Sequence, residues 1–244
     1  MKTKSNLFMR NIIGAALAVA SGVYSVSALA VPYYYTDWTS WNPAAGTAVG
    51  TITPSSGPAV TVNFDAIRSN GTNGTYLGVT SGIWTPATAY TSAQVDNASL
   101  FEALQLVGEN NMTYRVTLSE AIKDPLMAVT TLGSGGTPAT YDFNAPFTIL
   151  SQGSTCCWGS GSLTQSGNSL TGREGAGAIQ FIGTYSTFSW TMPNAEFWHA
   201  FTFGIRTTEA LEPTPPTNGV PEPASLALVG AGLAALASLR RRRM

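Results

Sequence analysis

The sequence predicts an all-β fold for the body of this chain, an antiparallel β-sandwich of the jelly-roll kind. Glycine, serine, threonine, asparagine and proline are abundant, whereas lysine and glutamate are few. That composition disfavours helices and favours strands joined by turns. Short runs of alternating apolar and polar residues also recur between turn residues. Many short strands with this spacing are typical of a sandwich or a barrel.

The expected strands follow one another along the middle of the chain. The clearest alternation is Val60-Thr61-Val62-Asn63-Phe64, and residues 112–118 repeat the pattern. Further strands are expected at residues 126–132, 147–150, 178–182, 185–192 and 199–205. Gly-rich or Pro-containing turns separate these runs, and no domain boundary is visible between them. Residues 31–210 are therefore predicted to form a single sandwich.

Two short segments have a helical pattern instead. Apolar residues between 99 and 107 fall on one face of a helix, with Asp96 or Asn97 available as its cap. Residues 119–123 could add one further helical turn. The sequence thus predicts two small helical pieces within an otherwise all-β body.

Charge is distributed unevenly along the chain. Residues 31–219 hold five basic and twelve acidic residues, a formal charge of −7, although the whole chain is close to neutral. An acidic body offers no attraction to phosphate backbones, so nucleic acid is excluded as an expected partner. The basic residues gather at the two ends, where they belong to targeting.

The N-terminal 30 residues have the three parts of a cleaved signal peptide. Lys2, Lys4 and Arg10 precede a short apolar stretch at residues 12–20. Ala28-Leu29-Ala30 fits the small-x-small pattern before a cleavage site, so signal peptidase is expected to leave Val31 at the mature N-terminus. Polar and small residues from position 21 onward interrupt the stretch too early for a transmembrane helix.

The C-terminal end has a tripeptide, an apolar segment and a basic cluster in that order. Pro221-Glu222-Pro223 follows a stiff, Pro-rich linker at residues 211–219. Residues 224–239 would form a transmembrane helix of about 24 Å, a little short for a bilayer unless the membrane thins. Positive charge stays in the cytoplasm, so the body should face the periplasm. The cluster is Arg240, Arg241, Arg242 and Arg243.

These three parts closely resemble the PEP-CTERM sorting signal, here residues 220–244. The resemblance implies a Gram-negative host with an exosortase, a partner that would cut near Pro221, Glu222 and Pro223. It also implies that the body is held briefly in the inner membrane and then moves to the cell surface or the medium. Such hosts usually make exopolysaccharide, which suggests a biofilm matrix. An ordinary tail anchor is the plain alternative.

The two cysteines are adjacent, and an exported protein meets an oxidising compartment. Cys156 and Cys157 could form a vicinal disulfide, bridge to other molecules or stay as free thiols. A ring between neighbours is strained, because their Cα atoms lie about 3.8 Å apart, below the usual disulfide range. With Trp158 a vicinal disulfide could form a platform for a sugar ring. Packing of Trp158 into the core is the commoner outcome for such a residue.

No catalytic, metal or cofactor site is predicted. His199 is the single histidine, so a multi-histidine metal site is excluded, and no Gly-x-Ser-x-Gly elbow is present. The carboxylates are scattered, and no Asp-x-Asp-x-Asp-Gly calcium loop occurs. We expect His199 to be packed or to cap a turn.

The sequence therefore favours a non-enzymatic surface or extracellular-matrix protein that associates with exopolysaccharide. Aromatic residues near the mature N-terminus could stack on sugars or pack as a strand on the sandwich. The alternative is a secreted glycan hydrolase, which two carboxylates about 5–10 Å apart in a cleft would favour. These aromatic residues are Tyr33, Tyr34, Tyr35, Trp38 and Trp41.

Overall fold

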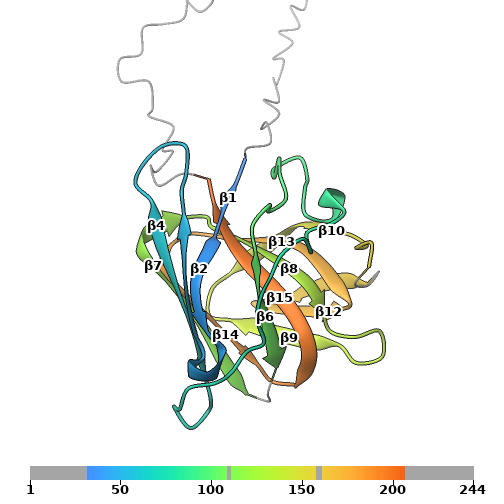
Figure 1. The fold of residues 1–244 in the computed structure, drawn as a ribbon. Coiled ribbons are helices and arrows are strands. Elements are labelled where there is room, and N and C mark those ends of the chain that lie inside the picture. The colour runs from blue at the N-terminus through green and yellow to red at the C-terminus, as the bar shows by residue number, and fades with distance from the viewer. Residues whose placement is uncertain (1–31, 109–110, 158–160, 207–244) are drawn as a thin grey trace, which may run out of the picture.

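The computed structural model describes residues 32–108, 111–157 and 161–206, and strands dominate it (Figure 1). Within these ranges the helical elements are two 3-10 turns, η1 (Pro43–Ala45) and η2 (Ala87–Ala89). The strands are β1 (Tyr34–Tyr35), β2 (Asp37–Asn42), β3 (Thr47–Ile52), β4 (Val60–Ile67), β5 (Gly78–Thr80), β6 (Ala103–Gly108), β7 (Met112–Lys123), β8 (Leu126–Leu132), β9 (Ala139–Phe143), β10 (Phe147–Gln152), β11 (Ser162–Ser166), β12 (Ser169–Arg173), β13 (Gly175–Phe181), β14 (Thr184–Met192) and β15 (Glu196–Ile205).

The strands form two antiparallel sheets. One, which we call the β15 sheet, has the order β10-β13-β8-β15-β6-β5, and β1 pairs with β15 at its side. The other, the β7 sheet, has the order β11-β12-β9-β14-β7-β4-β3-β2. Every pairing between these named strands is antiparallel. The predicted all-β class and the strands expected from the alternating runs are confirmed.

The inner faces of the two sheets enclose an aromatic core. In β4 and β7 the alternate residues expected to be apolar, such as Val62 and Val116, point into it. Neighbouring rings have centroids 4.6–6.4 Å apart, mostly tilted or edge-on. Such pairs add about 0.5–1.5 kcal/mol beyond the burial of their area. The largest members are Phe64, Tyr114, Tyr141, Phe181, Phe188, Trp190, Phe201 and Phe203.

A second apolar cluster covers the outer face of the β15 sheet. All seven residues of β8 are buried, because Met127 and Val129 face the inner core while Leu126 and Ala128 face this outer cluster. The sheet contributes mainly alanines here, which lets the segment between β5 and β6 approach closely. The covering side chains are Ile83, Trp84, Tyr90, Val95 and Ala98, joined by Tyr33 and Tyr35.

Both helical predictions are wrong. Residues 103–108 form β6, which pairs with β15 and places Leu104 and Leu106 in the inner core. Leu100, expected on the buried face of the helix, is instead 94% exposed. Residues 119–123 are the end of β7, where Ile122 and Lys123 pair with β14. In both places a long-range strand ladder takes up backbone groups that a helix would have bonded locally.

The described chain enters and leaves the sandwich at the same end (Figure 1). β1 pairs with the last residues of β15, so that Tyr34 lies opposite Ile205. Just beyond, Arg206 Nε donates to Tyr33 Oη at 2.9 Å, and the guanidinium lies 5.2 Å from the Tyr33 ring centroid. Residues that precede β1 and follow β15 are thereby attached to one pole of the body.

Within the described ranges no helix has the length and apolar character that crossing a bilayer requires. The helix predicted for residues 224–239 lies outside those ranges, as do the signal peptide at residues 1–30 and the linker at 211–219.

Candidate functional site

A pocket of about 290 Å³ lies where the first strands meet the loop that precedes β6. We call it the Asp37 pocket. Its walls come from three segments that are distant in the sequence: the start of the described chain, the end of β3 and the loop before β6. The lining residues are Pro32, Tyr33, Tyr34, Tyr35, Asp37, Thr51, Thr53, Asn97, Leu100 and Phe101.

The side-chain amide of Asn97 attaches the loop to the start of the first strand, because it pairs with both backbone polar groups of Tyr33. Its Oδ1 accepts a hydrogen bond from the Tyr33 N–H at 2.7 Å, and its Nδ2 donates to the Tyr33 carbonyl at 2.9 Å. The Tyr35 hydroxyl donates in turn to the Asn97 carbonyl at 2.9 Å. Asp96 or Asn97 was expected to cap a helix, but Asn97 instead pairs with the backbone of Tyr33, just before β1.

The pocket combines apolar walls with a few polar groups, as small-molecule sites do. Phe101 is 44% exposed, and Leu100 stands almost fully in solvent. Tyr34 is half-buried, with its hydroxyl donating to Ser55 Oγ at 2.6 Å. Asp37 and Thr53 are exposed and supply a carboxylate and a hydroxyl. A carboxylate accepts hydrogen bonds and attracts cations.

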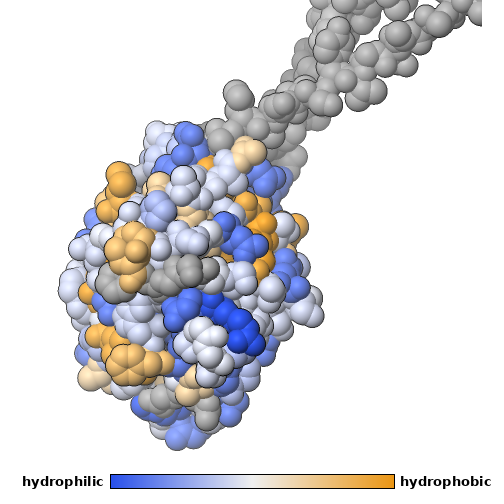
Figure 2. Space-filling model, turned by 90° about the vertical axis from the view of Figure 1, so that its right-hand side faces the viewer, coloured by the Kyte–Doolittle hydropathy of each residue, from blue (hydrophilic) through white to orange (hydrophobic). Residues whose placement is uncertain are grey.

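The N-terminal aromatic residues divide between packing and exposure. Tyr33, Tyr35 and Trp38 are buried, as the packed-strand interpretation required. Trp41 is 50% exposed on edge strand β2. On the face of the molecule in Figure 2, apolar side chains form separate small patches among polar ones. That distribution does not make a broad apolar docking face on this side.

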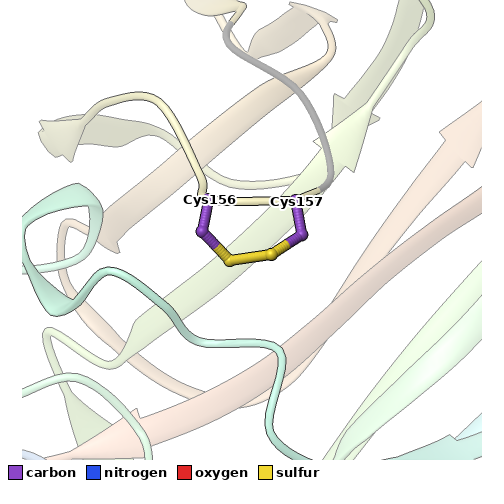
Figure 3. Close-up of a disulfide and its surroundings, with 2 residues drawn as sticks. All are labelled: Cys156 and Cys157. Atoms are coloured by element: carbon purple, nitrogen blue, oxygen red, sulfur yellow. A yellow bond between two sulfur atoms is a disulfide. The ribbon is translucent and has the colours of Figure 1, made fainter.

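Cys156 and Cys157 are joined by a disulfide between neighbours, with their Cα atoms 3.8 Å apart (Figure 3). Both residues are exposed, in the loop that follows β10. The Cys156 N–H donates to the Thr85 carbonyl at 3.2 Å, which attaches this loop to the segment covering the β15 sheet. Trp158, which could form a sugar platform with this disulfide or pack into the core, lies outside the described residues.

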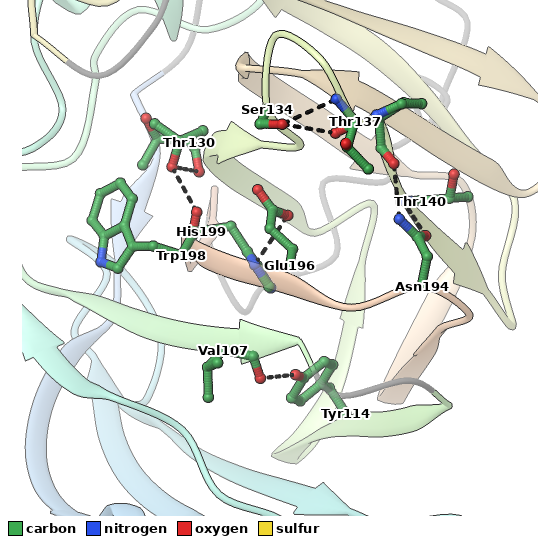
Figure 4. A network of polar contacts seen from close by, with 12 residues as sticks. Val107, Tyr114, Thr130, Ser134, Thr137, Thr140, Asn194, Glu196, Trp198 and His199 are labelled. Carbon is green, nitrogen blue, oxygen red and sulfur yellow. Dashed lines mark hydrogen bonds and ion pairs between the residues drawn. The ribbon is translucent and has the colours of Figure 1, made fainter.

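His199 is completely buried in β15 and contacts other core groups (Figure 4). Its Nδ1 lies 3.2 Å from Glu196 Oε2, and its ring meets that of Tyr141 edge-on at 5.4 Å. The distance is that of an ion pair, but the geometry is not that of a hydrogen bond, and Nε2 has no partner in the described structure. A side chain so enclosed cannot reach a substrate, so His199 is a packed residue.

The Tyr141 hydroxyl is buried beside this pair without a hydrogen-bond partner in the described part of the chain. Burial raises its pKa well above the usual value of 10, and the neighbouring Glu196 carboxylate and Tyr114 raise it further. Burial likewise raises the pKa of Tyr76 and of Tyr90 to about 12. The hydroxyl of Tyr114, also in the core, has a hydrogen-bond partner: it donates to the Val107 carbonyl at 3.0 Å (Figure 4).

Several carboxylates have structural partners. Asp65 accepts from Arg115 at 3.0 Å across β4 and β7. Asp142 accepts from the Ser169 hydroxyl at 2.5 Å, and Asp124 from the Gly183 N–H at 2.8 Å. Among the described residues, no three histidine, cysteine or acidic side chains gather in a way that could hold a metal ion.

Sequence reasoning missed the Asp37 pocket as a site. It singled out Tyr33, Tyr34 and Tyr35, but it placed Leu100 on a helix and gave Asp37 no role. The signal-cleavage residues Ala28, Ala30 and Val31 lie outside the described ranges, and so do the tripeptide and the arginines from 240 to 243.

Comparison with known families identifies the C-terminal end. The family described as the PEP-CTERM protein-sorting motif matches residues 219–243, so the chain carries this motif where the sequence predicted it. The match covers the tripeptide and the whole arginine cluster, but no part of the β-sandwich. No curated protein and no solved structure matches the chain.

We predict that Tyr141→Phe leaves the free energy of unfolding unchanged or raises it by up to about 1 kcal/mol at neutral pH, because an unpaired buried hydroxyl is removed. The matched control is Tyr114→Phe, which removes the hydrogen bond to the Val107 carbonyl and should lower stability by about 0.5–1.5 kcal/mol. Urea denaturation of both variants measures these changes. A larger loss for Tyr141→Phe than for Tyr114→Phe would mean that the Tyr141 hydroxyl has a partner.

The same variant should change how stability depends on pH. A raised pKa means that the folded state resists ionisation, so the stability contributed by neutral Tyr141 is complete below about pH 10 and is lost as the pH rises above it. Wild type should therefore lose stability between about pH 10 and 12 more steeply than Tyr141→Phe. Equal slopes would show that this hydroxyl does not titrate differently in the folded and unfolded states.

We predict that Cys156 and Cys157 form a disulfide with each other in the exported protein. Intact mass after thiol alkylation should show no added group without reductant and one on each sulfur after reduction. The protein should run as a monomer on a non-reducing gel. Alkylation without reductant would indicate free thiols. Dimers that dissociate when reductant is added would indicate disulfides between molecules.

Proposed function

We propose that this protein is an exosortase-processed surface or extracellular-matrix component whose β-sandwich associates with exopolysaccharide. The observation that carries the proposal is the sorting motif at residues 219–243, attached to a body made of two antiparallel sheets. The motif marks the chain as an exported protein that transits the membrane and is sorted to the cell surface, with an exosortase as its processing partner. Association with exopolysaccharide goes beyond the motif.

The placement of the chain ends suits this processing. Every described strand lies between residues 34 and 205, so a cut near Pro221 would remove none of them. β1 and the end of β15 are paired at one pole, which would point that pole toward the membrane while the tail is attached. Release would then deliver the complete sandwich and expose the Asp37 pocket at the same pole.

Binding fits the described chemistry better than hydrolysis does. The single histidine is buried, and Asp65, Asp124 and Asp142 each have a partner that uses their carboxylate in the fold. The Asp37 pocket instead offers an aromatic wall and polar groups at the surface. An aromatic ring with a polar edge is suited to the mixed apolar and hydroxylated faces of a sugar.

We predict that replacing Pro221-Glu222-Pro223 by three alanines leaves uncut protein in the inner membrane, because the sorting enzyme would lose its recognition sequence. Cell fractionation with a tag placed just after Val31 measures the distribution. Replacing Pro213 and Pro215 by alanine in the linker is the matched control and should leave processing intact. Unchanged release of the tripeptide variant would contradict processing at this motif.

We predict that the released protein is retained on exopolysaccharide from its own host and produces no new sugar ends. Retention is measured by co-sedimentation, with the same matrix freed of polysaccharide as the control. Hydrolysis is followed by the appearance of reducing ends during prolonged incubation. Absence of retention would contradict association, and a steady release of reducing ends would establish the glycan hydrolase instead.

A further inference from the structure

We propose that the Asp37 pocket binds one sugar unit that is uncharged or carries an amino group, and that it rejects units bearing a carboxylate. This inference rests on the proposed function, because it specifies which glycans the body would hold and where. Size, exposed apolar surface and charge support it separately.

The size of the pocket limits the ligand to about one ring. Its volume of about 290 Å³ lies just below the range of about 300–1,000 Å³ found for pockets that enclose drug-sized molecules. One sugar unit therefore matches it better than an extended oligosaccharide. Hydrogen bonds of Asn97 and Tyr35 join the loop before β6 to the first strand, and they hold these two walls of the pocket in place.

The rim leaves apolar surface that no other described residue covers. Leu100 is 94% exposed and Phe101 is 44% exposed, although the Trp84 indole donates to the Phe101 carbonyl at 3.0 Å and holds this part of the loop in place. Tyr34 also lines the pocket and adds a half-buried ring from the first strand. A ligand with one C–H-rich face would remove part of this surface from water, which stabilises the complex.

Asp37 determines the sign of the charge. No hydrogen bond or ion pair of its carboxylate occurs among the described residues, in contrast to Asp65, Asp124 and Asp142. The other described lining residues are uncharged. Arg206 is not among them, and its guanidinium is bonded to Tyr33. The carboxylate can accept from sugar hydroxyls or pair with an ammonium group, whereas a ligand carboxylate would be repelled.

The field of the whole body acts in the same direction. The described residues include nine acidic and five basic side chains, a formal charge of −4 with His199 neutral. An acidic polymer would meet repulsion on approach and again in the pocket, and salt would screen the first effect more than the second. Discrimination by the pocket itself should therefore persist at moderate ionic strength.

The test uses the full chain, purified in a detergent without a sugar headgroup so that the detergent cannot occupy the site. Calorimetry compares three oligosaccharides of equal length, built from glucose, glucosamine and galacturonic acid. The first two should bind, and the third should bind at least about tenfold more weakly, as expected for one like-charge contact near a protein surface. Asp37→Asn should reduce that gap by about tenfold.

Three further variants locate the effect. Asp65→Asn removes the same charge from the same sheet but outside the pocket lining, so it should leave the preference unchanged. The variant should fold, because an exposed ion pair contributes little to stability. Tyr34→Ala should weaken binding of all bound sugars about tenfold, while Tyr34→Phe keeps the ring and should retain most of the affinity. Thermal unfolding checks that each variant is folded. If Tyr34→Ala is unfolded, Asp37→Asn alone tests whether the pocket determines the preference.

The outcomes separate this inference from the proposed function. Binding of galacturonate as tight as that of glucose would overturn the inference and leave association with exopolysaccharide standing. An unchanged preference in Asp37→Asn would also overturn it, because the discriminating site would then lie elsewhere. Failure to bind any of the three, together with loss of retention on the host polysaccharide, would contradict both.

Discussion

Burial of the β15 sheet on both faces is the constraint on which the rest of this structure depends. The inner face is occupied by aromatic rings shared with the β7 sheet, and the outer face by alanines under the segment that runs from Ile83 to Ala98. Small residues such as Ala128, Ala178 and Ala200 allow that segment to lie directly on the sheet. Interiors are packed as densely as organic crystals, so larger side chains at these positions would displace the cover.

The surface features follow from this cover. Its last residues lead through Asn97 to the loop before β6, and Asn97 binds the first strand, so the Asp37 pocket forms at the edge of the covering layer. The disulfide loop is attached to the same layer by the bond from Cys156 to Thr85. Tyr33 and Tyr35 complete the outer cluster, which places the start of the described chain on the sheet and next to Arg206.

Polar groups are divided sharply between a packed interior and an accessible rim. The interior holds His199 and the Tyr141 hydroxyl, which are too enclosed for contact with an external molecule, and the buried Oε2 of Glu196 lies beside His199. Raised tyrosine pKa values express the same burial. The rim holds Asp37, Thr53 and exposed apolar side chains at the pole where both chain ends leave the body. A protein that is sorted through its tail and then released would present this pole only after processing.

The sequence by itself determined the features that are written locally in the chain. The sorting motif is a linear signal of about 25 residues. Strands such as β4 and β7 can be predicted from the alternation of apolar and polar residues within each strand. Composition alone favoured strands over helices, and a single histidine already made a multi-histidine metal site impossible.

Only the tertiary structure decided the features that depend on residues distant in sequence. Residues 99–107 have an acceptable helical face, yet β6 forms because β15 offers a complete hydrogen-bonding partner about 95 positions away. Asn97 looked like a helix cap, but its amide bonds Tyr33, 64 positions earlier. The burial of His199 and the position of Asp37 beside Phe101 likewise follow from strand pairing. Side-chain periodicity is a local property, whereas a pocket exists only after loops from several strands have been brought together.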